Sequence, residues 1–172
     1  MIRSAVPSDA KAIAQVHIHS WQQAYSDLMP REYLASLDQT LAQRTSYWLN
    51  AIESGDSTLL VAERDKQVIG WISVGASRDL DAAANNAGEV MALYVLQAHW
   101  HTGICPALWH AGLQSLIEQG HCRLTLWVLL RNDRAIRFYR KAGWVEETGT
   151  RRTLARGGVT LEEVRYGCPI IR

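Results

Sequence analysis

The sequence of 172 residues is poor in cysteine, and no cysteine stands where a disulfide framework or a zinc site would need it. The three cysteines, Cys105, Cys122 and Cys168, are odd in number, widely spaced and without a C-x-x-C pair. Small secreted domains and zinc ribbons use paired, closely spaced cysteines. The cysteine pattern therefore predicts a protein of a reducing compartment, and we expect a cytoplasmic location.

Charge of one sign and long apolar runs are also missing. Lys and Arg number 18 against 17 Asp and Glu, for a net charge of +1. A near-neutral chain has no general attraction for nucleic acid or for an anionic membrane. No apolar run approaches the ~20 residues of a membrane span, and the opening MIRSAVPSDAKAIAQ lacks the apolar core of a signal peptide. We expect neither a nucleic-acid nor a membrane partner.

The composition that remains is that of an ordinary globular domain. Hydrophobic residues make up 48% and charged residues 20% of the chain, and no repeat, low-complexity tract or linker divides it. Residues 1–172 are therefore expected to form a single domain. Seven tryptophans against one phenylalanine are unusual. They suit a bulky core, or one or two of them line a ligand pocket.

Apolar patterning predicts strands and helices in alternation. Strands are expected at 2–6, 58–63, 67–75, 88–95, 123–130, 144–147 and 159–166, and residues 64–66 read as a hairpin turn. Helices are expected at 10–24, in further stretches to about residue 53, at 106–119 and at 133–142. The order is β-α-α-β-β-β-α-β-α-β-β. It indicates an α/β domain with a mixed central sheet and helices on both faces.

Residues 99–108, HWHTGICPAL, lie between an expected strand and an expected helix. A helix N-terminus offers unpaired backbone N–H groups and the positive end of the helix dipole, which together suit a phosphate. Gly103 stands where the chain needs freedom in φ and room for close approach. Taken alone, the segment fits a phosphate loop and an ordinary strand-to-helix turn equally well.

Three stretches and the order of the elements resemble the GCN5-related N-acetyltransferase (GNAT) family. They are ALYVLQAHWHTGICPAL (92–108), LWVLLRNDRAIRFYRKAGW (126–144) and VHIHSWQQAYSDLMPREYLASL (16–37). The second is the most specific, because Asn132 is followed seven residues later by Tyr139 and then by the run Lys141 to Trp144. The resemblance implies the single-domain acyl-CoA N-acyltransferase fold and acetyl-CoA as co-substrate. Dimerisation is common in the family, so the resemblance also allows a homodimer.

The resemblance implies a set of cofactor-binding residues. The strand would offer its backbone to the pantetheine arm and the acetyl group, and the loop would hold the pyrophosphate. Asn132 would hold the pantetheine, or the backbone next to it, where two parallel strands separate. These positions are Leu93, Tyr94, Val95, His101, Thr102, Gly103, Ile104, Cys105, Pro106 and Asn132. The loop departs from the family pattern: Trp100 replaces Gln or Arg, Cys105 replaces Gly or Ala, and Pro106 has no N–H to give. We therefore expect coenzyme A to bind less tightly than it does to a glycine-rich loop.

Acetyl transfer in the family runs by direct attack of an amine on the thioester. By resemblance, Tyr139 would protonate the departing thiolate; the alternative is a core aromatic on the stripe of its helix. Many relatives use a glutamate as base at the position held here by Trp127, which cannot serve. Glu89, at the start of the cofactor strand, is the best remaining carboxylate, and a solvated edge glutamate is the alternative reading.

The acceptor pocket is expected between the first helices and the strand 88–95. His17, Trp21 and Tyr25 recur every four residues and so share one helix flank, either as acceptor-binding residues or as a half-buried amphipathic stripe. The pairs His17/His19 and His99/His101 have no Cys or carboxylate at a ligand spacing, so no metal is expected.

The function predicted is transfer of an acetyl group from acetyl-CoA to a primary amine of a small molecule or a protein. Two other classes stay open at this point. A non-catalytic acyl-CoA-binding or sensing module would explain Cys105 and Pro106, whereas Asn132 and Tyr139 favour the enzyme. A partner-binding protein that uses exposed tryptophans would need no cofactor.

Overall fold

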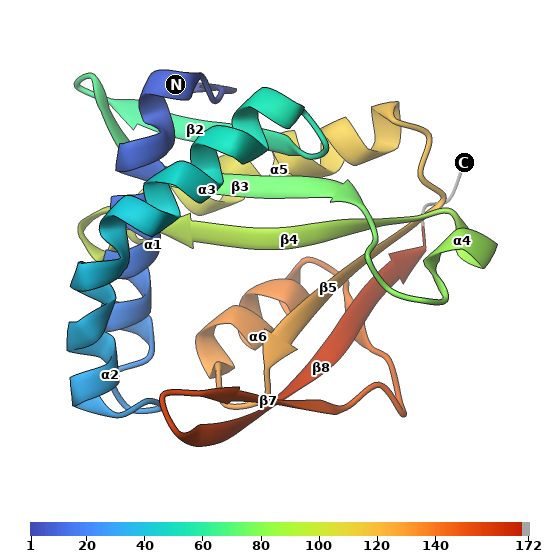
Figure 1. Cartoon of the computed structure of the whole chain (residues 1–172). Helices are drawn as coiled ribbons and strands as arrows, with labels where there is room; N and C mark the ends of the chain where they lie inside the picture. Colours follow the sequence, from blue (N-terminus) through green and yellow to red (C-terminus); the bar gives the residue numbers. More distant parts are fainter. Residues whose placement is uncertain (170–172) are drawn as a thin grey trace.

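A computed structural model describes residues 1–169, and in that part of the chain eight strands form one mixed sheet. The order across the sheet is β1-β2-β3-β4-β5-β8-β6, with β7 paired to β8 outside this path (Figure 1). The strands are β1 (Ile2–Ser4), β2 (Thr58–Arg64), β3 (Gln67–Ala76), β4 (Ala87–Val95), β5 (Arg123–Leu129), β6 (Val145–Glu146), β7 (Arg152–Arg156) and β8 (Val159–Pro169). All pairings are antiparallel except that of β4 with β5.

The helices cover both faces of this sheet. They are α1 (Ala10–Ala24), α2 (Arg31–Ser36), α3 (Leu41–Ser54), α4 (Ala82–Asn85), α5 (Ile104–Glu118) and α6 (Asp133–Lys141), with 3₁₀ turns at Pro7–Asp9, Leu37–Thr40 and Gln97–His99. Helices α1 and α3 bury Ile13, Val16 and Trp48 against β2 and β3 on one face. Helices α5 and α6 pack on the other face with Leu108, Leu116 and Ile136. The predicted mixed α/β fold with helices on both faces is thus confirmed.

Helix α5 lies unusually close to the sheet. A Cβ built on Gly112 would come within 2.6 Å of Ile72 Cδ1 on β3. Only glycine allows this approach without displacing a core side chain. The close contact fixes the height of α5 over the sheet, and with it the position of the loop that precedes the helix.

Strand β4 is irregular at the point where it leaves β5. Its pairing with β3 shifts register, because Ser73 pairs with Ala92 whereas Val74 pairs with Val90, which leaves Met91 as the extra residue of a bulge. The parallel pairing of β4 with β5 ends at the same place, with Val90 opposite Leu126. The two strands separate beyond that pair (Figure 1).

The structure adds elements that patterning did not predict. Strand β7 is absent from the expected order, and three helices rather than two stand between β1 and β2. Strand β7 was missed because it reads RTLAR, with Leu154 as its only partly buried residue. Residues 78–87, which lie between the expected strands 67–75 and 88–95, contain the short helix α4. Among residues 1–169, no helix combines the length and the apolar character needed to cross a bilayer.

Candidate active site

A cleft of about 1240 Å³ lies where β4 and β5 separate. It is walled by α1, β4, the first turn of α5, β5, α6 and the β7–β8 hairpin. Most of the residues singled out from the sequence line it: Trp21, Tyr25, Glu89, Leu93, Tyr94, Val95, His101, Gly103, Cys105, Pro106, Asn132 and Tyr139. His17, Thr102 and Ile104 are not part of its lining.

The open edge of β4 presents backbone groups to this cleft. The N–H of Leu96 donates to the carbonyl of Ile69 at 3.0 Å, which makes Leu96 and Ile69 a hydrogen-bonded pair of the antiparallel ladder. Hydrogen-bonded and non-bonded pairs alternate, so Val95 and Leu93 turn their N–H and C=O groups away from β3. Strand β5 no longer pairs there. The carbonyl of Val95 accepts a hydrogen bond from Trp100 Nε1 at 2.8 Å, and the N–H groups of Leu93 and Val95 face the cleft side.

The loop before α5 has the backbone shape expected of an anion-binding turn. Gly103 caps the helix with φ +84° and has open space where a Cβ would stand. Behind it, the N–H groups of Ile104 and Cys105 have no partner within the helix, because they belong to its first turn. Pro106 is the third helical residue and gives no N–H. Thr102 donates its hydroxyl proton to the His99 carbonyl at 2.7 Å, so this proton is already used within the loop.

An arginine side chain that the sequence analysis did not predict lies beside the loop. The guanidinium carbon of Arg134, on α6, lies 3.4 Å from the centre of the Trp100 ring, and both side chains line the cleft beside Cys105. Stacking on an aromatic face holds a guanidinium in place while its N–H groups remain available. The family pattern has Gln or Arg where this chain has Trp100, and Arg134 brings a positive charge to the same place from another helix.

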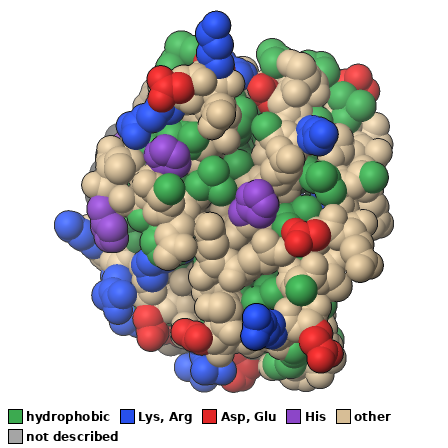
Figure 2. All heavy atoms as spheres, turned by 90° about the vertical axis from the view of Figure 1, so that its left-hand side faces the viewer, with side chains coloured by type: hydrophobic (Ala, Val, Ile, Leu, Met, Phe, Trp, Pro, Cys, Tyr) green, Lys and Arg blue, Asp and Glu red, His purple; other side chains and the backbone are tan. Residues whose placement is uncertain are grey.

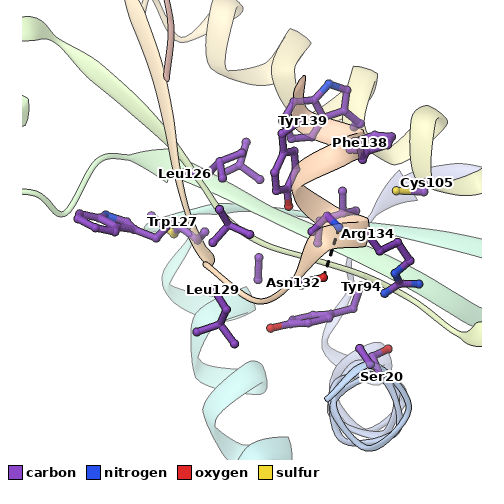
Figure 3. Close-up of a pocket in the computed structure, with 18 of the residues that line it drawn as sticks. Ser20, Tyr94, Cys105, Leu126, Trp127, Leu129, Asn132, Arg134, Phe138 and Tyr139 are labelled. Carbon is purple, nitrogen blue, oxygen red and sulfur yellow. Dashed lines mark hydrogen bonds between the residues drawn. The ribbon is translucent and has the colours of Figure 1, made fainter. Parts of the chain in front are cut away.

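Tyr139 points from α6 into the space between the separated strands, between Leu126 and Cys105 (Figure 3). Its ring is packed against Trp109, with 5.4 Å between centroids, and against Phe138, with 5.7 Å. Burial, with smaller contributions from Cys105 and Tyr94, raises the pKa of Tyr139 above its usual value. The phenol therefore keeps its proton at neutral and moderately alkaline pH, as a general acid must.

Asn132 stands at the N-terminus of α6. Its Oδ1 accepts a hydrogen bond from the N–H of Ala135 at 3.3 Å, so the side chain caps the helix (Figure 3). Tyr25 reaches the same part of the cleft from the end of α1, and burial raises its pKa, partly offset by a hydrogen bond from Asn132. Asn132 thus acts as a structural cap as well as lining the cleft.

Glu89 is not the solvated edge glutamate of the alternative reading, because its side chain is only 2% exposed. Arg78 binds it twice: Nη2 donates to Oε1 at 2.6 Å and Nε to Oε2 at 3.2 Å. The backbone N–H of Arg78 adds a third hydrogen bond to Oε2 at 3.0 Å. Glu89 reaches the cleft lining as half of an ion pair, with both carboxylate oxygens hydrogen-bonded to Arg78.

His17 lies outside the cleft, contrary to its expected place beside Trp21 and Tyr25. Its ring sits in an aromatic cluster under α1, with centroids 5.0 Å from Tyr94 and 5.6 Å from Trp71. Burial, with a smaller contribution from Arg44, lowers the pKa of His17 to about 3. The four-residue spacing predicted that all three side chains would lie together. In the structure, however, His17 faces the sheet and Trp21 faces the cleft.

Trp21 and Tyr94 form a polar link in the wall of the cleft. Trp21 Nε1 donates to the Tyr94 hydroxyl at 2.8 Å. The tryptophans divide between the two uses left open by the composition: Trp48, Trp71, Trp109 and Trp144 are buried, and Trp21, Trp100 and Trp127 line the cleft. Trp109 does both.

The far end of the cleft is built on β5 and the β7–β8 hairpin. Trp127 points away from Tyr139 (Figure 3), and its Nε1 donates to the Asp79 carboxylate at 3.1 Å. The guanidinium of Arg152 is stacked on the Trp127 ring, 3.5 Å from its centre. Asp79 is itself held by Arg165 at 3.0 Å. Sequence reasoning named Trp127 only as a residue unable to act as base, and it missed Arg152 because β7 was not predicted.

The side of the molecule that lies at the left in Figure 1 faces the viewer in Figure 2 and has no single sign of charge. On the face shown in Figure 2, basic and acidic side chains are interspersed around apolar ones. Within residues 1–169, no three His, Cys, Asp or Glu side chains gather as metal ligands.

Known proteins resemble this chain over nearly its whole length. The family whose profile matches, over residues 16–144, is described as the acetyltransferase (GNAT) family. An uncharacterized N-acetyltransferase of Bacillus subtilis, YuaI, is 30% identical over 98% of this chain and 92% of its own. An uncharacterized N-acetyltransferase of Mycobacterium tuberculosis is 28% identical over 84% of this chain and 87% of its own.

Solved structures of low sequence identity share the fold. The PaiA N-acetyltransferase of Thermoplasma acidophilum, in complex with coenzyme A, has a TM-score of 0.76 at 19% identity, over 99% of this chain and 98% of its own. YncA of Salmonella typhimurium, a putative acetyltransferase solved with acetyl-CoA, has a TM-score of 0.73 at 21% identity, over 100% of this chain and 94% of its own. With the profile match, the sequence relatives and the separated β4 and β5 strands in agreement, the chain belongs to the GNAT acetyltransferase family.

Proposed function

We propose that this N-acetyltransferase moves the acetyl group of acetyl-CoA to an amine of a small molecule or a protein by direct attack in the cleft described above. The observation that carries the proposal is the gap between β4 and β5. It exposes the backbone of Leu93 and Val95 beside Tyr139, within a cleft that continues to the loop at Gly103. Such an arrangement lets one extended ligand reach a phosphate site and a reaction site together.

The cofactor end of the cleft is assigned to Gly103, the first turn of α5 and Arg134. The N–H groups of Ile104 and Cys105, with the helix dipole, favour a pyrophosphate, and the guanidinium of Arg134 adds charge. His101 lines the cleft beside them with φ +61°, a backbone shape that turns the loop sharply.

The reaction is proposed as a single acyl transfer. The nitrogen of the amine attacks the thioester carbonyl carbon, and the developing oxyanion is stabilised by an N–H of β4, at Leu93 or Val95. The C–S bond then breaks and the thiolate takes the proton of Tyr139, which its raised pKa keeps in place until that step. Tyr139 regains a proton from solvent. The acetylated nitrogen must lose a proton to a base, and Glu89 is the candidate carboxylate of the lining.

The role of Glu89 is tested by its pH dependence. Glu89→Gln should lower kcat at neutral pH and lower it less as pH rises, because a free amine then needs less help from a base. Glu89 also neutralises Arg78, so melting temperature must be measured beside the rate. A pH–rate profile with the shape of the parent's would remove Glu89 from the proton path.

The decisive experiment follows thiol release from acetyl-CoA in the presence of a panel of amines, with acetyl-CoA binding measured by calorimetry. Binding with amine-dependent release and an acetylated product by mass spectrometry would support the proposal. Binding without release for every amine would favour the acyl-CoA-sensing alternative, and a chain that does not bind acetyl-CoA would overturn both.

A further inference from the structure

We infer that the acceptor is a small amine that also carries a carboxylate, held by guanidinium groups of the β7–β8 hairpin at the Trp127 end of the cleft. The inference rests on the proposed function and names its substrate class. Its starting point is the imbalance of charge in the lining. The basic side chains there are Arg78, Arg134, Lys141, Arg152 and Arg156, and the acidic ones are Glu89 and Glu163.

The two acidic side chains of the lining are already committed to arginines. Glu89 is bound by Arg78 through both carboxylate oxygens, and Glu163 accepts a hydrogen bond from Arg152 Nε. Their side chains are 2% and 17% exposed, whereas those of Arg78 and Arg152 are 63% and 48% exposed. Both acids are less exposed than the arginines bound to them, so the arginines present the exposed, cationic surface of this end of the cleft.

Arg152 is held in a fixed position by three neighbours. It is stacked on Trp127 at 3.5 Å, it donates to Glu163, and its Nη1 is 3.9 Å from Asp79 Oδ1. Trp127 is fixed in turn by the hydrogen bond of its Nε1 to Asp79. A guanidinium anchored through Nε and one face keeps N–H groups in a planar fork, the geometry that matches a carboxylate.

Arg156, at the other end of β7, has no acidic partner among residues 1–169. Its Nη1 donates to the carbonyl of Ala155 at 2.9 Å. The hairpin that carries it is fixed against α2, because a Cβ at Gly157 would come within 2.4 Å of the Tyr33 ring. Arg152 and Arg156 therefore line one cleft from a strand that is held at its tip, and both can face one ligand.

The same charges disfavour other acceptors. A polyamine or a lysine-rich peptide would bring extra positive charge to a wall whose exposed charged groups are arginines, and like charges repel there. An amine with a carboxylate would instead reach the wall as an anion once its amine is deprotonated for attack. The apolar floor of Tyr25, Met29, Leu129 and Leu161 leaves room for the carbon chain between the two groups.

The test compares matched amines on the full-length protein with saturating acetyl-CoA. Each of a series of amino acids of different side chain is assayed beside its amide, which keeps the amine and removes the anionic charge, and beside a linear polyamine. We expect the best amino acid to exceed its amide in kcat/KM by about 10-fold or more, as a charge-assisted hydrogen bond pair would give.

Variants then locate the effect. Arg152→Gln with Arg156→Gln should remove the preference for the carboxylate, by raising the KM of the amino acid much more than the KM of its amide. Arg152→Lys should keep part of the preference, because charge remains and the planar fork is lost. Arg151→Gln is the matched control, since Arg151 is exposed on the same segment and does not line the cleft. Equal melting temperatures and equal acetyl-CoA affinity would show that the variants fold.

The outcomes separate this inference from the proposed function. Amides or polyamines turned over as well as amino acids would overturn the inference and leave the acetyltransferase intact. A carboxylate preference that survives the double substitution would overturn the assignment to β7. Acetyl-CoA bound by the parent but no amine of any series acetylated would overturn the proposed function and the inference together.

Discussion

Replacing Tyr139 by phenylalanine separates a proton donor from a packing residue. The substitution deletes one hydroxyl and keeps the ring that packs on Trp109 and Phe138. The hydroxyl makes no hydrogen bond to another residue among the described interactions of residues 1–169, and the phenol lines the cleft. Its removal should therefore change the free energy of unfolding by less than about 1 kcal/mol.

The expected effect on the reaction is much larger. A positioned general acid contributes about 10²–10⁴-fold in rate, which corresponds to about 3–5 kcal/mol of transition-state stabilisation. Because the proton moves only as the C–S bond breaks, kcat should fall by that factor while the Kd of acetyl-CoA stays within about threefold. Burial raises the pKa of Tyr139, so the parent should not lose rate through this group as pH rises from 7 to 10.

The assay measures kcat with the best acceptor, the acetyl-CoA Kd and the melting temperature for the parent, Tyr139→Phe and Tyr47→Phe. Tyr47 is 63% exposed on α3 and does not line the cleft, so it controls for the loss of a tyrosine hydroxyl as such. A Tyr139→Phe protein with the parent's kcat would refute the acid role. Matched losses of binding and stability would instead make Tyr139 a core residue.

Three further predictions concern the loop, the stacked arginine and the buried histidine. Gly103→Val should weaken acetyl-CoA binding more than Gly103→Asn, as calorimetry can measure. No neighbour would contact a Cβ at this position, so the difference comes from the backbone φ of +84°, which Asn adopts more readily than Val. Arg134→Gln should weaken acetyl-CoA binding by about 1–2 kcal/mol and flatten its salt dependence, and unchanged binding at low and high salt would remove Arg134 from the site. The pKa of His17 is lowered to about 3, so between pH 6.5 and 3 only the unfolded chain binds that proton and stability falls on acidification, by up to about 1.4 kcal/mol per pH unit; His17→Phe should reduce this slope in chemical denaturation, and an equal slope would contradict the shift.

The parts of the fold that could be predicted are those in which local pattern and tertiary environment agree. Strands β2 to β5 are apolar and buried, and the turn between β2 and β3 has Asp65 and Lys66 at positive φ, as a tight hairpin needs. Strand β7 could not be predicted, because four of its five residues are exposed, two of them arginines, and its pairing with β8 depends on the folded chain. The register shift at Met91 could not be predicted from the sequence either, since any residue of an apolar strand can occupy a bulge.

The candidate site was predictable where a motif specifies backbone, and not where side chains from distant segments meet. Gly103 and Asn132 occupy the helix ends that their positions suggested. The pairing of Glu89 with Arg78 joins two strand ends across a loop, and no spacing rule gives it. His17 shows that a helical spacing can also mislead. A four-residue spacing puts His17 and Trp21 on one flank of α1, but His17 packs on the sheet whereas Trp21 lines the cleft.

The loop that lacks the usual glycines and glutamine is compensated from elsewhere in the chain. Trp100 cannot make the polar contact of the Gln or Arg in the family pattern. Instead its Nε1 donates a hydrogen bond to the Val95 carbonyl, and the guanidinium of Arg134 is stacked on its ring. Trp100 thus links the end of β4 to the first turn of α6, the helix that follows β5, and it is the separation of β4 from β5 that opens the cleft. If this link maintains the gap, Trp100→Gln, which restores the family residue, should weaken acetyl-CoA binding rather than strengthen it, because Arg134 loses its platform. Tighter binding by Trp100→Gln would show that the loop tolerates Trp100 without using it.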